Sequence, residues 1–366
     1  MGETEGRKRR LERWALQSAA RELLSGERVS WCMRRVAFGH RDVQVWHSPA
    51  VMRAHYKHLA ICGSVWHCPI CGAKITERRR VDLSNAITRH PELHPVLVTF
   101  TLSHTRQDKL KDVLGVLTDS YRKVRSGKGW ELFERGFQIV GGVRALEVTH
   151  GANGWHPHLH VLLFCRVRPD ADAIKQTLWA RWHHALERNH STAMFEHGVD
   201  VQIAFGDVAD YVSKFGHEPL KDSKRWGLEH ELTKSPTKLA RGDRGRTPLQ
   251  LLADYAGGDK QAGAIWKEYA VTFKGQRQLV WSKRLRAMLK LGQEKSDDEI
   301  AKETREDAVL LARLTLGMWR VVLGNDARGE LLEIAHAGDA GKVFEFLQSI
   351  GAGDRVEFER LAAAMS

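Results

Sequence analysis

Residues 141–164, GGVRALEVTHGANGWHPHLHVLLF, constrain the fold of this chain more than any other stretch. They contain two runs in which apolar residues alternate with others, and Gly151, Asn153 and Gly154 separate the runs. Glycine and asparagine tolerate the backbone angles that a tight hairpin turn requires. The stretch therefore predicts a β-hairpin, and with it an antiparallel sheet that packs on a core.

Three histidines occupy alternate positions on the second strand of this hairpin. Successive side chains of a strand point to opposite faces, so His156, His158 and His160 share one face, while Leu159 and Val161 lie on the other. A lone His-x-His is often only part of a solvent-facing strand. Here the second face is strongly apolar, which a sheet packed on a core requires.

A carboxylate joins two of the histidines if the turn is centred between Ala152 and Asn153. In that register Glu147 lies directly opposite His158, with the two Cβ atoms about 5 Å apart. Glu147, His158 and His160 then suit a divalent cation such as Mg²⁺, Mn²⁺ or Zn²⁺, with positions left for water or a phosphate oxygen. The sequence predicts a metal site here.

The histidine strand also resembles a known motif. His158-Leu159-His160 followed by Val-Leu-Leu resembles the His-hydrophobe-His motif of HUH endonucleases, and HPHLHVLLF is similar to that motif in rolling-circle plasmid replication initiators. The resemblance implies a nuclease in which His158 and His160 bind the cation, Mg²⁺ or Mn²⁺. Glu147 is a third ligand on geometric grounds alone.

Charge and composition are consistent with a DNA partner. The chain holds 57 basic and 45 acidic residues, for a net charge of +12, which favours a polyanionic ligand. No apolar run of about eighteen residues and no secretory leader is found, so we expect a cytoplasmic protein that does not bind membranes. Three of the five cysteines cluster, which fits a metal site in a reducing compartment better than disulfides.

The clustered cysteines lie in residues 55–80, HYKHLAICGSVWHCPICGAKITERRR. Cys68 and Cys71 have the Cys-x-x-Cys spacing at which two thiolates reach one tetrahedral Zn²⁺, and Cys62 precedes them by six residues. The fourth ligand is open: His58 is the first candidate, ahead of His55 and His67, and Cys32 is more remote. A redox Cys-x-x-Cys is the rival interpretation, but it would leave Cys62 unexplained.

CGSVWHCPICGAKI also resembles a Cys-rich segment that precedes the nuclease motifs in many Gram-positive-type plasmid initiators. The resemblance implies a structural zinc segment at the N-terminal side of the nuclease. A basic helix is expected to follow over residues 75–89, in which Arg78 and Arg79 are candidate DNA contacts.

Residues 96–104, VLVTFTLSH, alternate in the manner of a strand covered on one side, and they resemble the first motif of these initiators. Helices are expected over residues 107–125 and 170–189, and a short strand over 199–204. His104 ends the first of these strands, where it could approach the metal or DNA.

The segment DVADYVSKF predicts an amphipathic helix that holds the candidate nucleophile. Asp207, Tyr211 and Lys214 fall on one flank of its apolar stripe, because residues three and four apart are neighbours on a helix. A tyrosine oxygen can attack a phosphodiester if a cation draws charge from the phosphate and a base accepts the proton. An isolated Tyr-x-x-Lys is usually only the edge of a helix.

YVSKFG resembles the third motif of HUH replication initiators. The resemblance implies that Tyr211 is the nucleophile and Lys214 its assisting cation. Some relatives place a second tyrosine or a Lys-Tyr pair in this motif, whereas Phe215 follows Lys214 here. Either one tyrosine suffices or a carboxylate activates water in place of the second, and Asp207 is the first candidate for that base.

The implied reaction is metal-assisted transesterification of single-stranded DNA. It forms a 5′-phosphotyrosine and a free 3′-OH that can prime a polymerase. The phosphodiester energy is retained in the covalent link, so ATP is not needed, and the sequence has no Gly-x-x-x-x-Gly-Lys-[Ser/Thr] loop. The expected partners are plasmid origin DNA, both at the single-stranded nick site and as duplex, together with a host helicase and DNA polymerase.

Residues 217–263 are rich in lysine, arginine and glycine. Such runs are either solvated loops or a track for the DNA backbone, and the sequence does not separate these alternatives. The candidate DNA contacts in this region are Lys224, Arg225, Arg241 and Arg244.

The fold class expected is α+β, with a central antiparallel sheet flanked by helices in the manner of HUH endonucleases. The expected segments are a basic arm and zinc-binding segment (1–90), the nuclease core (91–220), a basic loop with helices that contacts DNA (221–295) and a helical C-terminal domain (296–366). The last is expected to recognise duplex origin DNA or to mediate self-association, for example as a homodimer.

Two other functions remain compatible with the sequence. A relaxase or transposase shares the His-x-His motif and the tyrosine, but the zinc segment and the compact length favour the replication initiator. A zinc-containing DNA-binding regulator without catalysis is the alternative from a different class.

Overall fold

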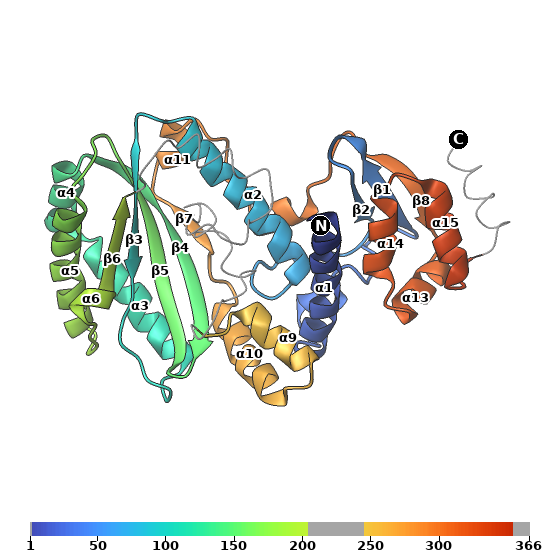
Figure 1. The fold of residues 1–366 in the computed structure, drawn as a ribbon, viewed down its shortest axis with the longest axis horizontal. Coiled ribbons are helices and arrows are strands. Elements are labelled where there is room, and N and C mark those ends of the chain that lie inside the picture. Colours follow the sequence, from blue (N-terminus) through green and yellow to red (C-terminus); the bar gives the residue numbers. More distant parts are fainter. Residues whose placement is uncertain (1, 204–244, 354–366) are drawn as a thin grey trace. The chain divides into compact units, whose positions relative to one another are not determined.

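The protein is described by a computed structural model, which covers residues 2–203 and 245–353. The chain divides into two compact units, of which the first joins Met1–Cys71 with Ser296–Ser366 and the second is Gly72–Lys295. Each unit contains an antiparallel sheet with helices against it, which confirms the α+β class predicted from the sequence (Figure 1). The division into four functional segments stays a prediction.

The second unit is built on a five-stranded sheet in the order β6-β3-β5-β4-β7, with every neighbouring pair antiparallel. Its strands are β3 (His94–Phe100), β4 (Ile139–Gly151), β5 (Gly154–Cys165), β6 (Val199–Ile203) and β7 (Leu279–Trp281). Its helices are α2 (Pro69–Thr88, which begins in the first unit), α3 (Leu110–Val124), α4 (Gly127–Gly136), α5 (Ala171–Glu187), α6 (Phe195–Gly198), α9 (Pro248–Ala256), α10 (Lys260–Phe273) and α11 (Leu285–Met288).

The predicted hairpin is the pair β4–β5, and β5 lies at the centre of this sheet. Its register places Gly151 opposite Gly154 and Glu147 opposite His158, so the register expected from the turn residues is confirmed. Gly154 has φ +81°, a left-handed conformation that glycine adopts without strain. A Cβ there would also lie 3.1 Å from the Thr105 carbonyl oxygen, so this turn position excludes larger residues.

Helices cover both faces of the sheet (Figure 1). On one face Phe100 of β3 packs against Tyr121 of α3 and Trp182 of α5, with ring centroids 5.5 and 5.1 Å apart. On the other face Leu83 of α2 and Leu285 of α11 belong to one buried cluster with sheet residues Leu97, Val143, Leu162 and Phe164. The alternation of β5 places the histidines on this second face, nearer the hairpin tip than Leu162.

The first unit is built on a three-stranded antiparallel sheet in the order β2-β1-β8. Its strands are β1 (Val43–Ser48), β2 (Arg53–Lys57) and β8 (Val309–Leu314). Its helices are α1 (Gly2–Leu23), the 3-10 turns η1 (Arg28–Trp31) and η2 (Pro49–Val51), α12 (Asp297–Lys302), α13 (Leu316–Gly324), α14 (Arg328–Ala335) and α15 (Ala340–Ser349).

The two ends of the chain share one core in this unit. Trp14, Tyr56 and Trp319 are buried in the same cluster, and the rings of Tyr56 and Trp319 lie 5.2 Å apart. The fully buried guanidinium of Arg328 donates to Gln17 Oε1 at 2.9 Å. Gln17 and Arg328, which are 311 residues apart in sequence, are thereby packed together.

The structure departs from the expected pattern after Asp297, where helices were expected throughout. Val309–Leu314 forms β8 instead, because it pairs with the edge of β1 from Val43 to His47. A tertiary partner therefore decides the conformation of this short apolar run.

Within the described ranges, no helix combines the length and apolarity needed to cross a bilayer.

Candidate metal centres and functional site

The structure brings Glu147, His158 and His160 together on the hairpin, as the sequence predicted. Nε2 of His158 lies 3.4 Å and Nε2 of His160 lies 3.1 Å from the same carboxylate oxygen, Oε2 of Glu147. One ligand atom from each of the three residues lies within 4.8 Å of the others. The group is largely buried, with Glu147 only 3% exposed.

The Nδ1 atoms of both histidines have partners of their own. Nδ1 of His158 lies 3.3 Å from the carbonyl oxygen of His156, and Nδ1 of His160 lies 3.0 Å from Oγ1 of Thr99 on β3. A carbonyl oxygen only accepts, so His158 carries a proton on Nδ1, and Thr99 can accept one from His160 in the same way. In these neutral tautomers both Nε2 lone pairs would be available to a cation bound beside Glu147, whereas without a cation the same Nε2 atoms hydrogen-bond to the carboxylate.

These residues fit a divalent cation. A cation placed among the three ligand atoms would accept one lone pair from each of them in place of the protons that His158 and His160 share with Glu147. Octahedral coordination at about 2.1 Å places adjacent ligand atoms about 3 Å apart, which is close to the observed separations. A mixed nitrogen and oxygen set suits Mn²⁺ or Mg²⁺ with further positions for water or substrate oxygen. Metal-binding histidines commonly donate their other ring nitrogen to a fixed acceptor, and the His156 carbonyl oxygen and the Thr99 hydroxyl stand at the positions for this.

The electrostatics of the group favour an ionised Glu147. Burial alone would raise the pKa of Glu147, but hydrogen bonds from His158 and His160 outweigh it and hold the pKa of this carboxyl well below its usual range. Burial, together with the neighbouring His158 and His104, lowers the pKa of His156 to about 4. His156 is therefore neutral at neutral pH, where Glu147 is charged.

Thr99 lies in the segment VLVTFTLSH, and its contact with His160 could not be foreseen from the sequence. We expect Thr99→Val to weaken Mn²⁺ binding by about 10- to 100-fold, because Nδ1 of His160 loses its acceptor and the ring loses its orientation. Isothermal titration with Mn²⁺ measures this. Thr177→Val is the matched control, because its hydroxyl donates only to the backbone of α5. Equal affinity in the two variants would show that Thr99 does not orient His160.

A second candidate centre lies in the first unit, where four buried thiols converge. The Sγ atoms of Cys32 and Cys71 lie 3.6 Å apart, those of Cys62 and Cys71 3.7 Å, and those of Cys68 and Cys32 3.8 Å. Zn²⁺ with four thiolates at about 2.3 Å requires sulfur–sulfur separations of about 3.8 Å. The four side chains are 0–3% exposed, so the set is closed, as structural zinc sites are.

The structure places Cys32, not His58, beside the other three thiols. Nδ1 of His58 lies 2.7 Å from Oδ1 of Asp42, and its ring stacks on His40. Cys32 lies beside the other thiols because residues 33–37 pair with residues 58–60. In this pairing the Met33 N–H donates to the Ala60 carbonyl oxygen at 2.8 Å. The spacing of the cysteines in the sequence carries no sign of this pairing, because β1 and β2 intervene.

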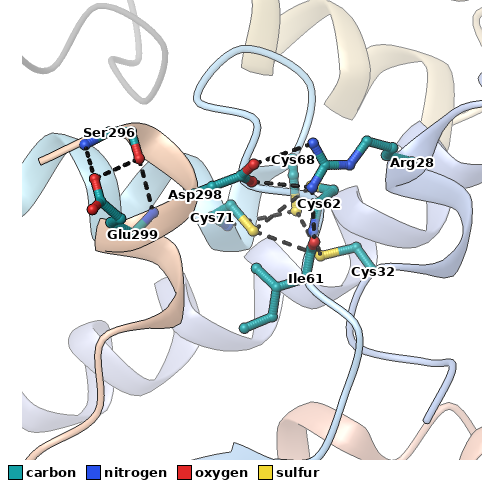
Figure 2. A network of polar contacts seen from close by, with 9 residues as sticks. All are labelled: Arg28, Cys32, Ile61, Cys62, Cys68, Cys71, Ser296, Asp298 and Glu299. Carbon is teal, nitrogen blue, oxygen red and sulfur yellow. Dashed lines mark hydrogen bonds and ion pairs between the residues drawn. The ribbon is translucent and has the colours of Figure 1, made fainter. Parts of the chain in front are cut away.

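The surroundings of the four thiols include a segment from the other end of the chain (Figure 2). Arg28 donates to Oδ1 of Asp298 at 3.0 Å and to the Ile61 carbonyl oxygen at 3.3 Å. Asp298 lies on α12, which Ser296 and Glu299 cap reciprocally. Gly63 has φ +62°, and a Cβ there would lie 1.9 Å from Asp298 Oδ1, so this position requires glycine.

Three of the remaining candidate residues, Arg78, Arg79 and His104, lie within the described part of the chain. Arg78 pairs with Asp82 at 3.5 Å, and Arg79 donates to Gln278 at 2.9 Å, so both have protein partners on or near α2. Nε2 of His104 lies 2.8 Å from Nδ1 of His156, beside the metal group. The candidates that lie outside the described residues are Asp207, Tyr211, Lys214, Lys224, Arg225, Arg241 and Arg244.

Comparisons with known proteins identify the family. The model of a family described as replication protein matches residues 56–322. The protein called Protein rep from Streptomyces lividans is 27% identical over 310 residues, and the match covers 66% of each chain. A neomycin resistance protein from Streptomyces cyanogenus is 28% identical over 132 residues, covering 29% of this chain and 30% of that one.

No solved structure matches the chain. The matched family region runs from β2 to α13 and includes the hairpin with Glu147, His158 and His160. It also spans three of the four clustered cysteines and leaves out Cys32. This chain therefore belongs to the replication protein family, which confirms the resemblance to plasmid replication initiators found in its sequence.

Proposed function

We propose that this protein initiates rolling-circle replication of a plasmid by nicking and rejoining single-stranded origin DNA through a 5′-phosphotyrosine. The observation that carries the proposal is the convergence of Glu147, His158 and His160 on the central hairpin of a replication protein family member. Both Nε2 atoms and one carboxylate oxygen point to a single position, where a cation and a phosphate oxygen can meet.

Two metal ions are part of the proposal. Mg²⁺ or Mn²⁺ would be held by Glu147, His158 and His160, and Zn²⁺ by Cys32, Cys62, Cys68 and Cys71. When bound, the first cation supplies Lewis acidity that draws charge from a phosphate oxygen. The second is structural, because four buried thiolates leave no open position for substrate.

Tyr211 is the proposed nucleophile. Its Oη forms a bond to phosphorus while the bond from phosphorus to O3′ breaks, and the phenol proton passes to a base. The 3′ oxygen leaves as a hydroxyl once protonated. Lys214 assists by stabilising the phenolate or a neighbouring phosphate, and Asp207 is the proposed base that activates water for a second step.

The other tyrosines support this choice. Tyr56, Tyr121 and Tyr269 are buried, and burial raises the pKa of all three, which opposes formation of a phenolate. Tyr255 is half-buried on α9, with its ring against Gly263. Of the five tyrosines in the sequence, Tyr211 is the best candidate.

The proposed partners follow from this chemistry. Origin DNA is the substrate, and a host DNA polymerase extends the 3′-OH after a host helicase opens the duplex. Arg78 and Arg79, with the basic residues between 221 and 244, are proposed backbone contacts. A homodimer on the duplex origin is one proposed assembly.

A covalent adduct separates this proposal from its alternatives. We expect labelled single-stranded plasmid DNA, incubated with the protein and Mg²⁺ or Mn²⁺, to yield a protein–DNA species that survives SDS. A non-catalytic DNA-binding regulator retards the DNA but leaves no species that survives SDS. A relaxase or transposase of the same class also forms the adduct, and is distinguished by whether the protein supports replication of a plasmid that carries the origin.

A further inference from the structure

Helices cover one face of the three-stranded sheet in the first unit. Val43 and Val45 of β1 are buried in one cluster with Met318 of α13, Leu331 of α14 and Val343 of α15. Successive side chains of a strand point to opposite faces, so the residues that alternate with these valines lie on the second face of the sheet. The second face is therefore built from residues that do not belong to this core.

Polar contacts connect the side chains of the second face. Gln44 donates to Oδ2 of Asp42 at 3.2 Å, and Nε1 of Trp46 donates to Oε1 of Gln44 at 2.9 Å. Lys57 of β2 and Arg313 of β8 both lie opposite Gln44 in the register. Nζ of Lys57 is 3.5 Å from the centroid of the Trp46 ring, and Nε of Arg313 is 3.3 Å from Oδ2 of Asp42. These contacts place all five residues on the same face.

The second face is positively charged. The three strands, VQVWHS, RAHYK and VLLARL, contain no Asp or Glu. Asp42 precedes β1, and its carboxylate is engaged by Arg313 and by Nδ1 of His58, which lies 2.7 Å from Oδ1. The ammonium of Lys57 lies over the Trp46 ring and has no hydrogen bond or ion pair to any residue that the structure describes. An aromatic ring does not neutralise an ammonium, so Lys57 can still bind an anion.

A loop beside this face carries a fully exposed aromatic ring. The ring is that of Phe38, which lies between two exposed arginines, Arg35 and Arg41. Neither guanidinium forms a hydrogen bond or ion pair within the described part of the chain. The loop is held at the end of the sheet, because the ring of His40 stacks on that of His58 with centroids 3.8 Å apart. A free ring with a cation on either side suits a base and its neighbouring phosphates.

We propose that the second face and this loop bind single-stranded DNA. Phe38 stacks on a base. Lys57, Arg35 and Arg41 contact phosphates. The excess of positive charge favours a polyanion, and the exposed ring favours unpaired bases, because the bases of a duplex are stacked on one another. The proposal rests on origin DNA as the substrate proposed above, but not on the chemistry at Glu147.

Fluorescence anisotropy of a labelled oligodeoxythymidylate, measured in EDTA to prevent cleavage, tests this binding. We expect Phe38→Ala to bind the single strand about tenfold more weakly than the wild type, a loss in the range for one base stacked on an aromatic ring. Affinity for a duplex of the same length should change by less than about twofold, because a duplex offers no free base face. Thermal unfolding of this variant should match the wild type, because Phe38 is fully exposed.

Lys57→Gln tests the charge of the second face. We expect weaker binding of the single strand, and a slope of log affinity against log salt that falls in magnitude by about 0.7, the value for one phosphate contact to a single strand.

Two control variants lie on the covered side of the same sheet. Lys342→Gln removes an exposed lysine from α15, and Leu316→Ala removes an exposed apolar side chain from α13. Both helices contribute to the core on that side. Each control should bind the single strand within about twofold of the wild type, because neither residue belongs to the second face.

Three results would overturn the proposed surface. In the first, Phe38→Ala and Lys57→Gln bind the single strand as their controls do. In the second, Phe38→Ala loses as much affinity for the duplex as for the single strand. In the third, polyglutamate displaces the single strand as well as unlabelled oligodeoxythymidylate does at the same charge concentration, which would indicate an acidic protein as the partner.

The adduct assay separates failure of this surface from failure of the nuclease proposal. If the wild type forms an SDS-resistant adduct and the two variants bind DNA as their controls do, the surface is wrong and the nuclease proposal stands. If the wild type forms no adduct but the losses of affinity are confined to Phe38→Ala and Lys57→Gln, the nuclease proposal fails and the surface stands.

Discussion

Cys32→Ser is expected to abolish zinc retention and to unfold the first unit, whereas His58→Ala is expected to keep one zinc ion per chain. Cys32 Sγ lies 3.6 Å from Cys71 Sγ, while His58 is engaged by Asp42. Structural zinc contributes about 10 kcal/mol or more to the folding of small zinc domains, comparable with the total stability of about 5–15 kcal/mol of a typical protein. Elemental analysis of the purified variants measures the zinc, and thermal unfolding measures the stability.

Cys165→Ala controls for the loss of a cysteine as such. Cys165 is fully buried on β5 in the second unit, and burial raises the pKa of its thiol to about 11, so it stays protonated. We expect this variant to retain its zinc and to lose only the stability that a small cavity costs, about 1 kcal/mol. Zinc retained by Cys32→Ser but lost from His58→Ala would restore the ligand set expected from sequence spacing.

Tyr211→Phe is expected to abolish adduct formation with single-stranded DNA while leaving DNA affinity largely intact. Removal of a catalytic nucleophile costs about 10⁴-fold or more in rate, whereas the loss of one phenol hydroxyl changes little of a binding surface. Denaturing gel electrophoresis of labelled DNA measures the adduct, and anisotropy in EDTA measures the affinity.

Tyr255→Phe is the matched control, because Tyr255 lies half-buried on α9 and has no role in the proposed chemistry. It should form adduct at the wild-type rate. If Tyr211→Phe forms as much adduct as the wild type, the nucleophile is another residue. If neither the wild type nor either variant forms an adduct, the result favours a non-catalytic DNA-binding protein.

The hairpin and its metal group were predictable because both depend on local rules. Alternation of apolar side chains fixes the faces of β5, and the Gly-Ala-Asn-Gly turn fixes which residues oppose each other, so Glu147 is found opposite His158. The helices α3 and α5 were expected near their observed positions for the same reason, since apolar periodicity marks them in the sequence.

Other features depend on tertiary pairing and leave no local sign. Cys32 reaches the thiol cluster only because residues 33–37 pair with 58–60, and β8 forms only because β1 offers an edge. The role of Thr99 depends on the register between β3 and β5, which places it opposite His160. Tyr211, Lys214 and Asp207 lie outside the described residues, so their catalytic roles stay predictions.

Peptide mapping of the adduct by mass spectrometry identifies the residue to which the DNA is attached. The protein is incubated with single-stranded origin DNA and Mn²⁺, the DNA is trimmed by nuclease, and the protein is digested. We expect a nucleotide attached to Tyr211, absent when Mn²⁺ is withheld and absent in Glu147→Gln. A nucleotide on another residue, or one that forms equally without the cation, would contradict it.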